Sequence, residues 1–79
     1  MAKKNTATVV KVTHTEMICW SIRYNELKRE DCSTKMERAK AAQLSEIEGW
    51  CLEELARIDT ILSMLHQMYM FETGTEYCG

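Results

Sequence analysis

Proline is absent from this 79-residue chain, and glycine occurs only at Gly49, Gly74 and Gly79. Folds built from many short strands need turn residues of both kinds, so their scarcity argues against an all-β architecture. No apolar run approaches the roughly 18 residues of a membrane-spanning helix. Lys3 and Lys4 are followed by polar residues, unlike a secretory signal. We therefore expect a cytoplasmic, mainly helical protein that does not contact a membrane.

Sequence motifs for catalysis or metal binding are also missing. The four cysteines and two histidines include no C-x-x-C pair and no two ligands at the helical i, i+4 spacing, which argues against a zinc site. There is no glycine-rich phosphate loop, and no histidine is spaced to activate a cysteine or serine. We therefore expect no enzyme, no metal and no cofactor, and cysteines that stay mostly reduced.

The overall composition is that of a folded domain, with 46% apolar and 28% charged residues, close to globular averages. Residues 1–79 make a single domain, and a domain this small buries only about 60% of its unfolded surface. Such domains usually gain stability from disulfides, a metal or oligomerisation. Because the sequence indicates neither disulfides nor a metal site, association with another chain is the favoured source of stability.

Strand-like character is confined to residues 6–13, which follow a start at residues 1–5 that we expect to be flexible. This segment reads Thr-Ala-Thr-Val-Val-Lys-Val-Thr. β-branched residues favour an extended backbone, but a lone strand needs a mate. The segment would pair with its own copy in a dimer, with a partner chain or with extended C-terminal residues 69–73, or it would lie extended on the helices.

A first helix is predicted over residues 15–30. Thr13 or Thr15 is suited to cap its start, with Glu16 in its first turn. Apolar residues that recur at spacings of three and four predict its inward stripe. The stripe consists of Met17, Trp20, Tyr24 and Leu27, flanked by Ile18 and Ile22.

A second, longer helix is predicted over residues 34–71. The polar run at residues 31–34 is the clearest interruption of the pattern, and Thr34 with Glu37 fits a capping box. From Leu44 onward, apolar residues follow a regular seam with spacings of three and four. The seam consists of Leu44, Ile47, Cys51, Leu55, Ile58, Leu62, Leu65 and Tyr69.

An interruption near Gly49 is the alternative to one continuous second helix. Ser45 with Glu48 makes another possible capping box just before it. A glycine inside a helix costs only about 1 kcal/mol, so the continuous helix is favoured. Gly74 is a natural stop, after which residues 74–79 form a tail.

A hairpin of two such unequal helices would leave half of the longer one bare. At 1.5 Å per residue the longer helix spans roughly 57 Å and the shorter one roughly 24 Å. Exposed apolar patches of that size are rare on monomers. We therefore predict that a second copy of the chain or another protein covers six residues: Ile58, Ile61, Leu62, Leu65, Met68 and Tyr69.

The methionines near the C-terminus allow two interpretations. Methionine and aromatic side chains make adaptable binding surfaces for partner helices. They also pack well in the core of a homo-oligomer, which is the favoured interpretation. The residues concerned are Met64, Met68, Met70, Tyr69 and Phe71.

Charge is divided unevenly along the chain. Residues 1–40 carry nine Lys and Arg against five Asp and Glu, whereas residues 41–79 carry one Arg against seven Asp and Glu. This asymmetry fits antiparallel self-pairing, an acidic face for a basic partner, or two solvated faces.

The function we expect is protein binding without catalysis. The chain would be an interaction or inhibitor module that docks on a larger intracellular protein. Its acidic half would occupy a basic, nucleic-acid-binding surface of that protein. The acidic partner face would consist of Glu46, Glu48, Glu53 and Glu54.

The alternative is a DNA-binding regulator with the element order of a ribbon-helix-helix dimer, in which paired strands read the major groove. The contacts would come from Lys3, Lys4 and Lys11 in the basic half. Nucleic acid is the less favoured partner because the C-terminal half is strongly acidic. Phosphate binding must also weaken as salt rises, which would separate the two functions.

Overall fold

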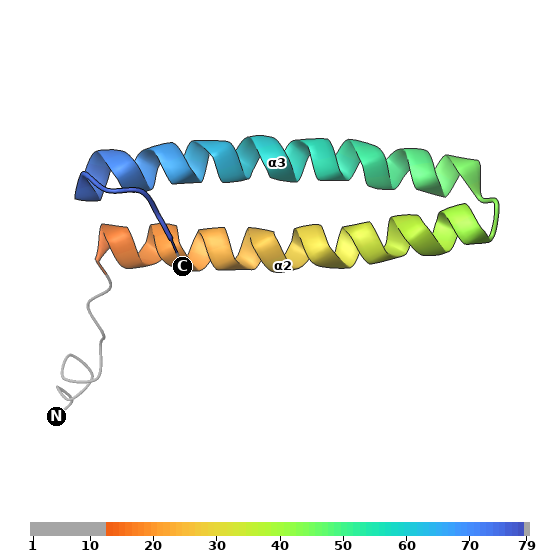
Figure 1. Cartoon of the computed structure of the whole chain (residues 1–79), viewed down its shortest axis with the longest axis horizontal. Coiled ribbons are helices and arrows are strands. Elements are labelled where there is room, and N and C mark those ends of the chain that lie inside the picture. Colours follow the sequence, from red (N-terminus) through yellow and green to blue (C-terminus); the bar gives the residue numbers. More distant parts are fainter. Residues whose placement is uncertain (1–12, 79) are drawn as a thin grey trace, which may run out of the picture.

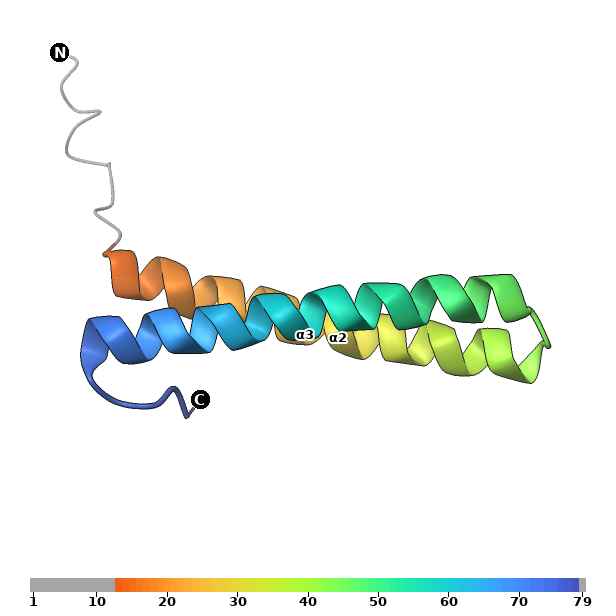
Figure 2. The ribbon, with the colours of Figure 1, turned by 90° about the horizontal axis from the view of Figure 1, so that it is seen from above.

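Two long antiparallel helices make up the fold (Figure 1). The computed structural model describes residues 13–78. α2 spans His14–Ala41 with 28 residues, and α3 spans Ser45–Thr73 with 29. Seen from above, the two ribbons cross near their middles at a shallow angle (Figure 2). The prediction of a helical hairpin is confirmed, although the bounds of both helices differ from those predicted.

Several expectations fall on residues that are not described. The extended segment at residues 6–12, the flexible start at residues 1–5, and the candidate nucleic-acid contacts Lys3, Lys4 and Lys11 all lie outside the described residues. No strand occurs within residues 13–78. The described part of the fold consists of the two helices, their connection and the C-terminal tail.

The start of α2 is fixed by the predicted cap. Thr13 has an extended backbone, and its Oγ1 accepts a hydrogen bond from the Glu16 N–H at 3.1 Å. Glu16 Oε1 in turn accepts from the Thr13 N–H at 3.0 Å. This reciprocal capping box satisfies two N–H groups that a helix start otherwise leaves free.

The predicted break at residues 31–34 is wrong, because α2 runs straight through it. Thr34 does not cap a helix. Its hydroxyl donates to the Glu30 carbonyl at 3.1 Å, one turn earlier, as threonines inside helices often do. Cys32 fills a buried position facing α3, so packing against α3 outweighs the weak helix propensity of this segment.

The chain reverses at residues 42–44 instead. Gln43 has φ +61°, in the left-handed region where glycine is usual. The Leu44 N–H donates to the Ala39 carbonyl at 2.8 Å, and the Gln43 N–H donates to the Lys40 carbonyl at 3.1 Å. These bonds close the end of α2 in the manner of a Schellman turn. Glutamine is uncommon in this conformation, so composition alone did not mark the turn.

Gly49 does not interrupt α3, and the second possible capping box does not form. The cap position of α3 is Leu44, which makes no side-chain capping bond, and Ser45 is already helical. α3 ends at the predicted stop, where Gly74 takes φ +78° and its N–H donates to the Met70 carbonyl at 2.7 Å. The continuous second helix is therefore confirmed through Gly49, but its start at residue 34 is wrong.

The contact between the helices follows a seam on each. α3 uses the predicted seam, with Cys51 and Ile58 buried. α2 uses not the predicted stripe but the residues beside it. Its buried residues recur at spacings of three, four or seven: Ile18, Ile22, Asn25, Cys32 and Ala39.

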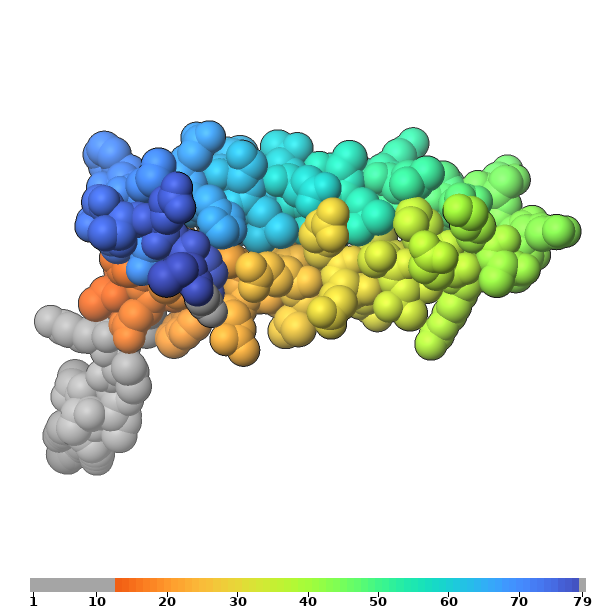
Figure 3. Space-filling model, in the orientation of Figure 1, coloured from red at the N-terminus to blue at the C-terminus, as the bar shows by residue number. Residues whose placement is uncertain are grey.

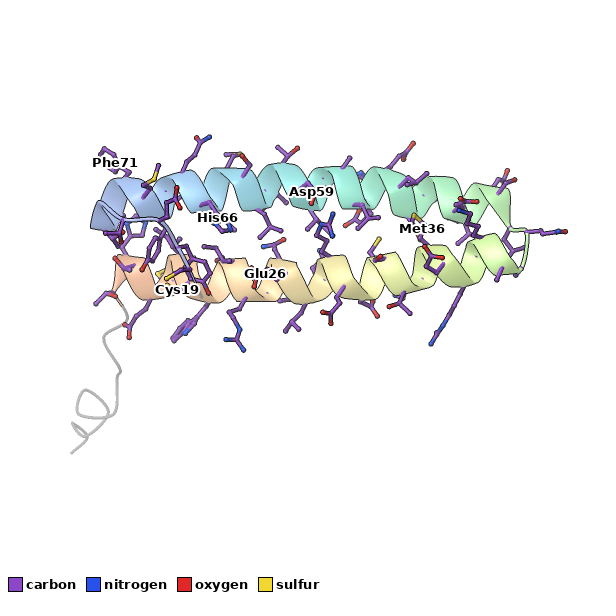
Figure 4. The ribbon with its side chains drawn as sticks, in the orientation of Figure 1. Cys19, Glu26, Met36, Asp59, His66 and Phe71 are labelled. Atoms are coloured by element: carbon purple, nitrogen blue, oxygen red, sulfur yellow. The ribbon has the colours of Figure 1, made fainter. Side chains whose placement is uncertain are left out.

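The length of α2 explains why the side that faces α3 differs from the predicted one. The predicted stripe of Met17, Trp20, Tyr24 and Leu27 would continue into the polar residues Asp31 and Thr34. The seam from Ile18 to Ala39 can pack against α3 over about six turns. Met36, for example, lies between the two helices (Figure 4) and packs on the cluster of Cys32, Cys51 and Ile58. The stripe that appeared to face inward therefore faces solvent.

Because the two helices are nearly equal in length, α2 reaches along the whole of α3. The prediction that half of the longer helix has no cover within the chain is therefore wrong. The side of α3 that faces α2 is covered, and Ile22 and Ile58 are 0% and 1% exposed. What remains uncovered is a different side of the hairpin.

Candidate functional site

Ion pairs join the basic α2 to the acidic α3. Arg29 Nε lies 2.6 Å from Asp59 Oδ1, and Lys28 Nζ lies 3.8 Å from Glu54 Oε2. Near the open end of the hairpin, His14 Nδ1 lies 3.3 Å from Glu72 Oε2. The uneven division of charge along the sequence is therefore in part an intrachain pairing. These pairs are largely solvent-exposed, so each adds little to the stability of the hairpin.

One face of the hairpin is covered by the C-terminal tail, which returns across the open end in Figure 3. The Tyr77 ring packs edge-on against His66, with centroids 5.5 Å apart, and against Tyr69, at 5.2 Å. His66 points from α3 toward α2 (Figure 4). Burial, followed by the nearby Glu26 carboxylate, raises the pKa of the Tyr77 hydroxyl above its ordinary value. On this side the tail serves as an internal partner.

Large apolar side chains outside the interhelical contact remain exposed at the open end. They form three pairs that are each seven residues apart and therefore lie on one side of their helix. Phe71, the most exposed at 87%, points away from α2 (Figure 4). We call this surface the apolar face; it consists of Met17, Tyr24, Ile61, Met64, Met68 and Phe71.

Shallow hollows connect the two helices across the apolar face. One is lined by residues of both helices, among them Met17, Leu65 and Met68. A second hollow is also lined by Met68, together with Met64 and Phe71. A third joins Met17 to Tyr24 along α2. Since neighbouring hollows share residues, the surface is continuous across the two helices.

Toward the turn, the same side of the hairpin becomes charged and then apolar again. A hollow there is lined by Lys28 and Lys35 from α2 and by Ile47, Trp50 and Glu54 from α3. Lys28 Nζ also sits 5.6 Å from the centre of the Tyr24 ring, at the boundary with the apolar face. We call Ile47 and Trp50 the turn-end pair.

The six residues predicted to form an interface divide into three groups. Ile58 is buried against α2, so it belongs to the hairpin core. Ile61 and Met68 are exposed and belong to the apolar face. The other three, Leu62, Leu65 and Tyr69, are half-buried along the interhelical contact.

The four predicted acidic residues do not share one environment. Glu54 is engaged by Lys28 and also by Arg57, whose Nη2 lies 3.5 Å from its carboxylate. Glu48 is half-buried. Glu46 and Glu53 are exposed, lie seven residues apart on α3, and form no ion pair within residues 13–78.

Two of the four cysteines, Cys32 and Cys51, behave as core residues rather than as a reactive site. Cys32 Sγ donates a hydrogen bond to the Cys51 carbonyl at 3.4 Å, and both side chains are buried. Burial, followed by the proximity of Cys51, raises the pKa of the Cys32 thiol above its ordinary value. This disfavours the reactive thiolate. Within residues 13–78, no three His, Cys, Asp or Glu side chains are grouped to hold a metal ion.

Sequence reasoning missed Met17 and Tyr24 as site residues, because it placed them inside. The C-terminal methionine cluster was found, but its members separate. Met64 and Met68 lie on the apolar face, whereas Met70 lines a hollow beside the tail residue Tyr77. In the sequence, the seven-residue spacing of Ile61 with Met68 and of Met64 with Phe71 is the signal for the α3 side of the apolar face.

Comparison with known protein families, curated proteins and solved structures gives no match to this chain. No helix within the described part of the chain is long and apolar enough to cross a membrane. The apolar face is therefore the feature from which a function is proposed.

Proposed function

We propose that this chain is a non-catalytic protein-interaction module that docks on another protein through the apolar face. The observation that supports the proposal most directly is the exposure of the six side chains of that face beside a thin interhelical core. Thirteen large apolar side chains of the described residues are exposed, against six buried apolar ones. Contiguous exposed patches of this kind usually mark interaction surfaces.

Residue types on the apolar face suit such a role. Methionine is unbranched and polarizable, so it adapts to the shape of a partner. Tyr24 and Phe71 supply large aromatic contact areas, which often dominate the binding energy at interfaces. A face built from three methionines, two aromatics and an isoleucine is suited to receive an amphipathic helix.

A basic surface on the target is part of the same proposal. Glu46 and Glu53 lie on the outer side of α3 and flank the exposed Trp50 in sequence. Such carboxylates beside the turn-end pair favour a partner with Lys or Arg at that end, including one that otherwise binds nucleic acid. They would chiefly raise the association rate and the salt dependence of binding.

No observation favours the nucleic-acid alternative. Three of the α2 cations in the described residues are already held in ion pairs: Lys28, Arg29 and Lys35. Phosphate binding requires free positive charge on the facing surface. We therefore propose protein binding alone.

The test compares Met64→Glu with Met70→Glu. Both methionines are exposed on α3, at 58% and 45%, but only Met64 belongs to the apolar face. Proteins retained from an extract by the wild-type chain are identified, and each is then titrated as a purified protein. We expect a true partner to bind Met64→Glu at least tenfold more weakly, about 1.4 kcal/mol, and to bind Met70→Glu like wild type.

The same titration tests these two carboxylates with the double variant Glu46→Lys, Glu53→Lys. We expect weaker binding and a loss of salt dependence. Unchanged binding would remove the basic surface from the proposal. If every retained protein bound Met64→Glu as tightly as wild type, the proposed use of the apolar face would be wrong.

A further inference from the structure

We infer that the occupant of the apolar face is a second copy of this chain, which forms a four-helix bundle with both turns at the same end. The inference rests on the proposed interaction function and names the partner and its orientation. In this bundle the two-fold axis runs parallel to the helices, and α2 of each copy lies against α3 of the other.

The exposed area is of the right size for such a dimer. The apolar face and the turn-end pair together present eight large side chains on one side of the hairpin. Each exposes about half of its surface, or roughly 100 Å². Eight such side chains supply roughly 800 Å² per copy, which is the contribution of one partner to an interface of standard size.

Helix direction is compatible with this two-fold axis and equally with one perpendicular to the helices, which would set α2 antiparallel to α2 and α3 antiparallel to α3. Charge and register distinguish the two. α2 and α3 run in opposite directions within the hairpin. Rotation about an axis parallel to the helices leaves the direction of each helix unchanged and places α2 of one copy opposite α3 of the other. Each α2 therefore gains a second antiparallel α3 as a neighbour. All four contacts around the bundle are then antiparallel, as in up-down-up-down bundles.

Charge favours the axis parallel to the helices. On this face α2 presents Lys28 and Lys35, with Asp31 paired to Lys35, and α3 presents Glu54, which pairs with Lys28 within the chain. With the axis parallel to the helices, the basic side of α2 meets the acidic side of α3 from the second copy. A perpendicular axis would instead bring α2 against α2 and like charges together, at a cost in stability.

The apolar residues also match in register. Met17 and Tyr24 lie at the open end, at the same level as the α3 residues of the apolar face. In the proposed bundle, Met17 and Tyr24 meet Ile61, Met64 and Phe71 of the second copy. With the perpendicular axis, Ile61 and Met64 would instead meet the charged middle of the hairpin. Each copy uses the same surface, so the assembly closes at two chains.

The first test is the solution mass of the wild-type chain with reductant present, measured by light scattering on a sizing column. We expect twice the 9.2 kDa of one chain. Met64→Glu should raise the dimer dissociation constant at least tenfold, because a carboxylate would be buried without a partner. Met70→Glu is the matched control and should remain dimeric. Circular dichroism of both variants checks that the helices are retained.

The orientation is tested by a photo-crosslinker. The aromatic ketone benzoylphenylalanine replaces Trp50, which is 64% exposed at the turn end. After irradiation the covalent dimer is isolated by its mass and digested. We expect crosslinks to residues 34–41 of the second copy, at the turn end of its α2. Crosslinks to residues 64–71 would overturn the proposed orientation.

The outcomes separate this inference from the proposed function. A monomeric wild type at all concentrations, together with a different protein whose binding depends on Met64, would overturn the dimer and leave the interaction function standing. A dimer that Met64→Glu dissociates, without any other partner, supports the dimer and limits the function to self-association. A monomer with no partner dependent on Met64 would overturn both.

Discussion

Replacement of Ser33 by proline is expected to lower the free energy of unfolding by at least about 3 kcal/mol. Ser33 lies in the interior of α2. There the proline ring removes a backbone hydrogen bond and clashes with the preceding turn. For a hairpin this small, such a loss approaches the whole stability. Urea denaturation followed by circular dichroism at 222 nm measures the effect.

The matched control is Ser45→Pro, the same substitution twelve residues later. Ser45 is the first residue of α3, where proline is favoured because its N–H has no partner inside the helix. Leu44 before it has φ −98° and ψ 80°, outside the helical region. We expect a change within about 0.5 kcal/mol. If Ser33→Pro were the tolerated variant, the chain would turn at residues 31–34 after all.

Replacement of Ile58 by alanine is the second change with a large expected effect, about 3 kcal/mol of unfolding free energy. Ile58 is 1% exposed and belongs to the cluster with Cys32 and Cys51. Truncation removes buried methyl groups and leaves a cavity between the two helices. Thermal and urea unfolding at one fixed protein concentration measures the loss.

Leu52→Ala provides the control on the same helix. Leu52 is 52% exposed and lies outside both the interhelical core and the apolar face. We expect it to lower the free energy of unfolding by less than about 1 kcal/mol. Equal losses for Leu52→Ala and Ile58→Ala would contradict the described packing of α3 on α2.

Sequence patterns predicted those parts of the fold that depend on residues close together in the chain. The absence of proline and the spacing of apolar residues indicated a helical hairpin. Thr13 with Glu16 indicated the start of α2, and Gly74 the end of α3. The spacing also identified the apolar seam on α3 from Cys51 to Tyr69, although its C-terminal half was expected to face a second chain and instead faces α2. Each of these features depends on residues within one or two turns of one another.

The position of the turn could not be predicted in the same way. Residues 31–34 have the polar, weakly helical composition of a break, yet Cys32 packs against α3 and keeps the helix continuous. The actual turn contains no glycine or proline, and Gln43 takes the left-handed conformation that glycine usually supplies. Tertiary packing outweighs local propensity at both places.

The error in the turn carried over to the candidate site. With α2 assumed to be short, the stripe containing Trp20 and Tyr24 was the better inward face. With α2 at its full 28 residues, the stripe containing Ile18 and Ile22 packs along the entire contact. Which side of α2 faces outward is thus a property of both helices together. The same dependence explains why Ile58 was assigned to an interface rather than to the core.

Ion pairs within the chain reduce the contribution that charge is expected to make to partner recognition. Glu54 and Asp59 find their cations on α2, so part of the acidic surface expected to attract a target is already neutralised. The apolar face has no such internal partner among the described residues, in contrast to the opposite side, where Tyr77 packs on His66 and Tyr69. Recognition is therefore proposed to depend mainly on apolar contact.

The most direct measurement is the oxidation of Met64 relative to Met70 within the wild-type chain, by hydroxyl-radical footprinting and mass spectrometry at micromolar concentration. In the isolated hairpin Met64 is the more exposed of the two, at 58% against 45%. If a second copy covers the apolar face, we expect Met64 to oxidise several-fold more slowly than Met70 and to lose this protection on dilution. Faster oxidation of Met64 at every concentration would show that the face is bare, and would contradict the proposed bundle.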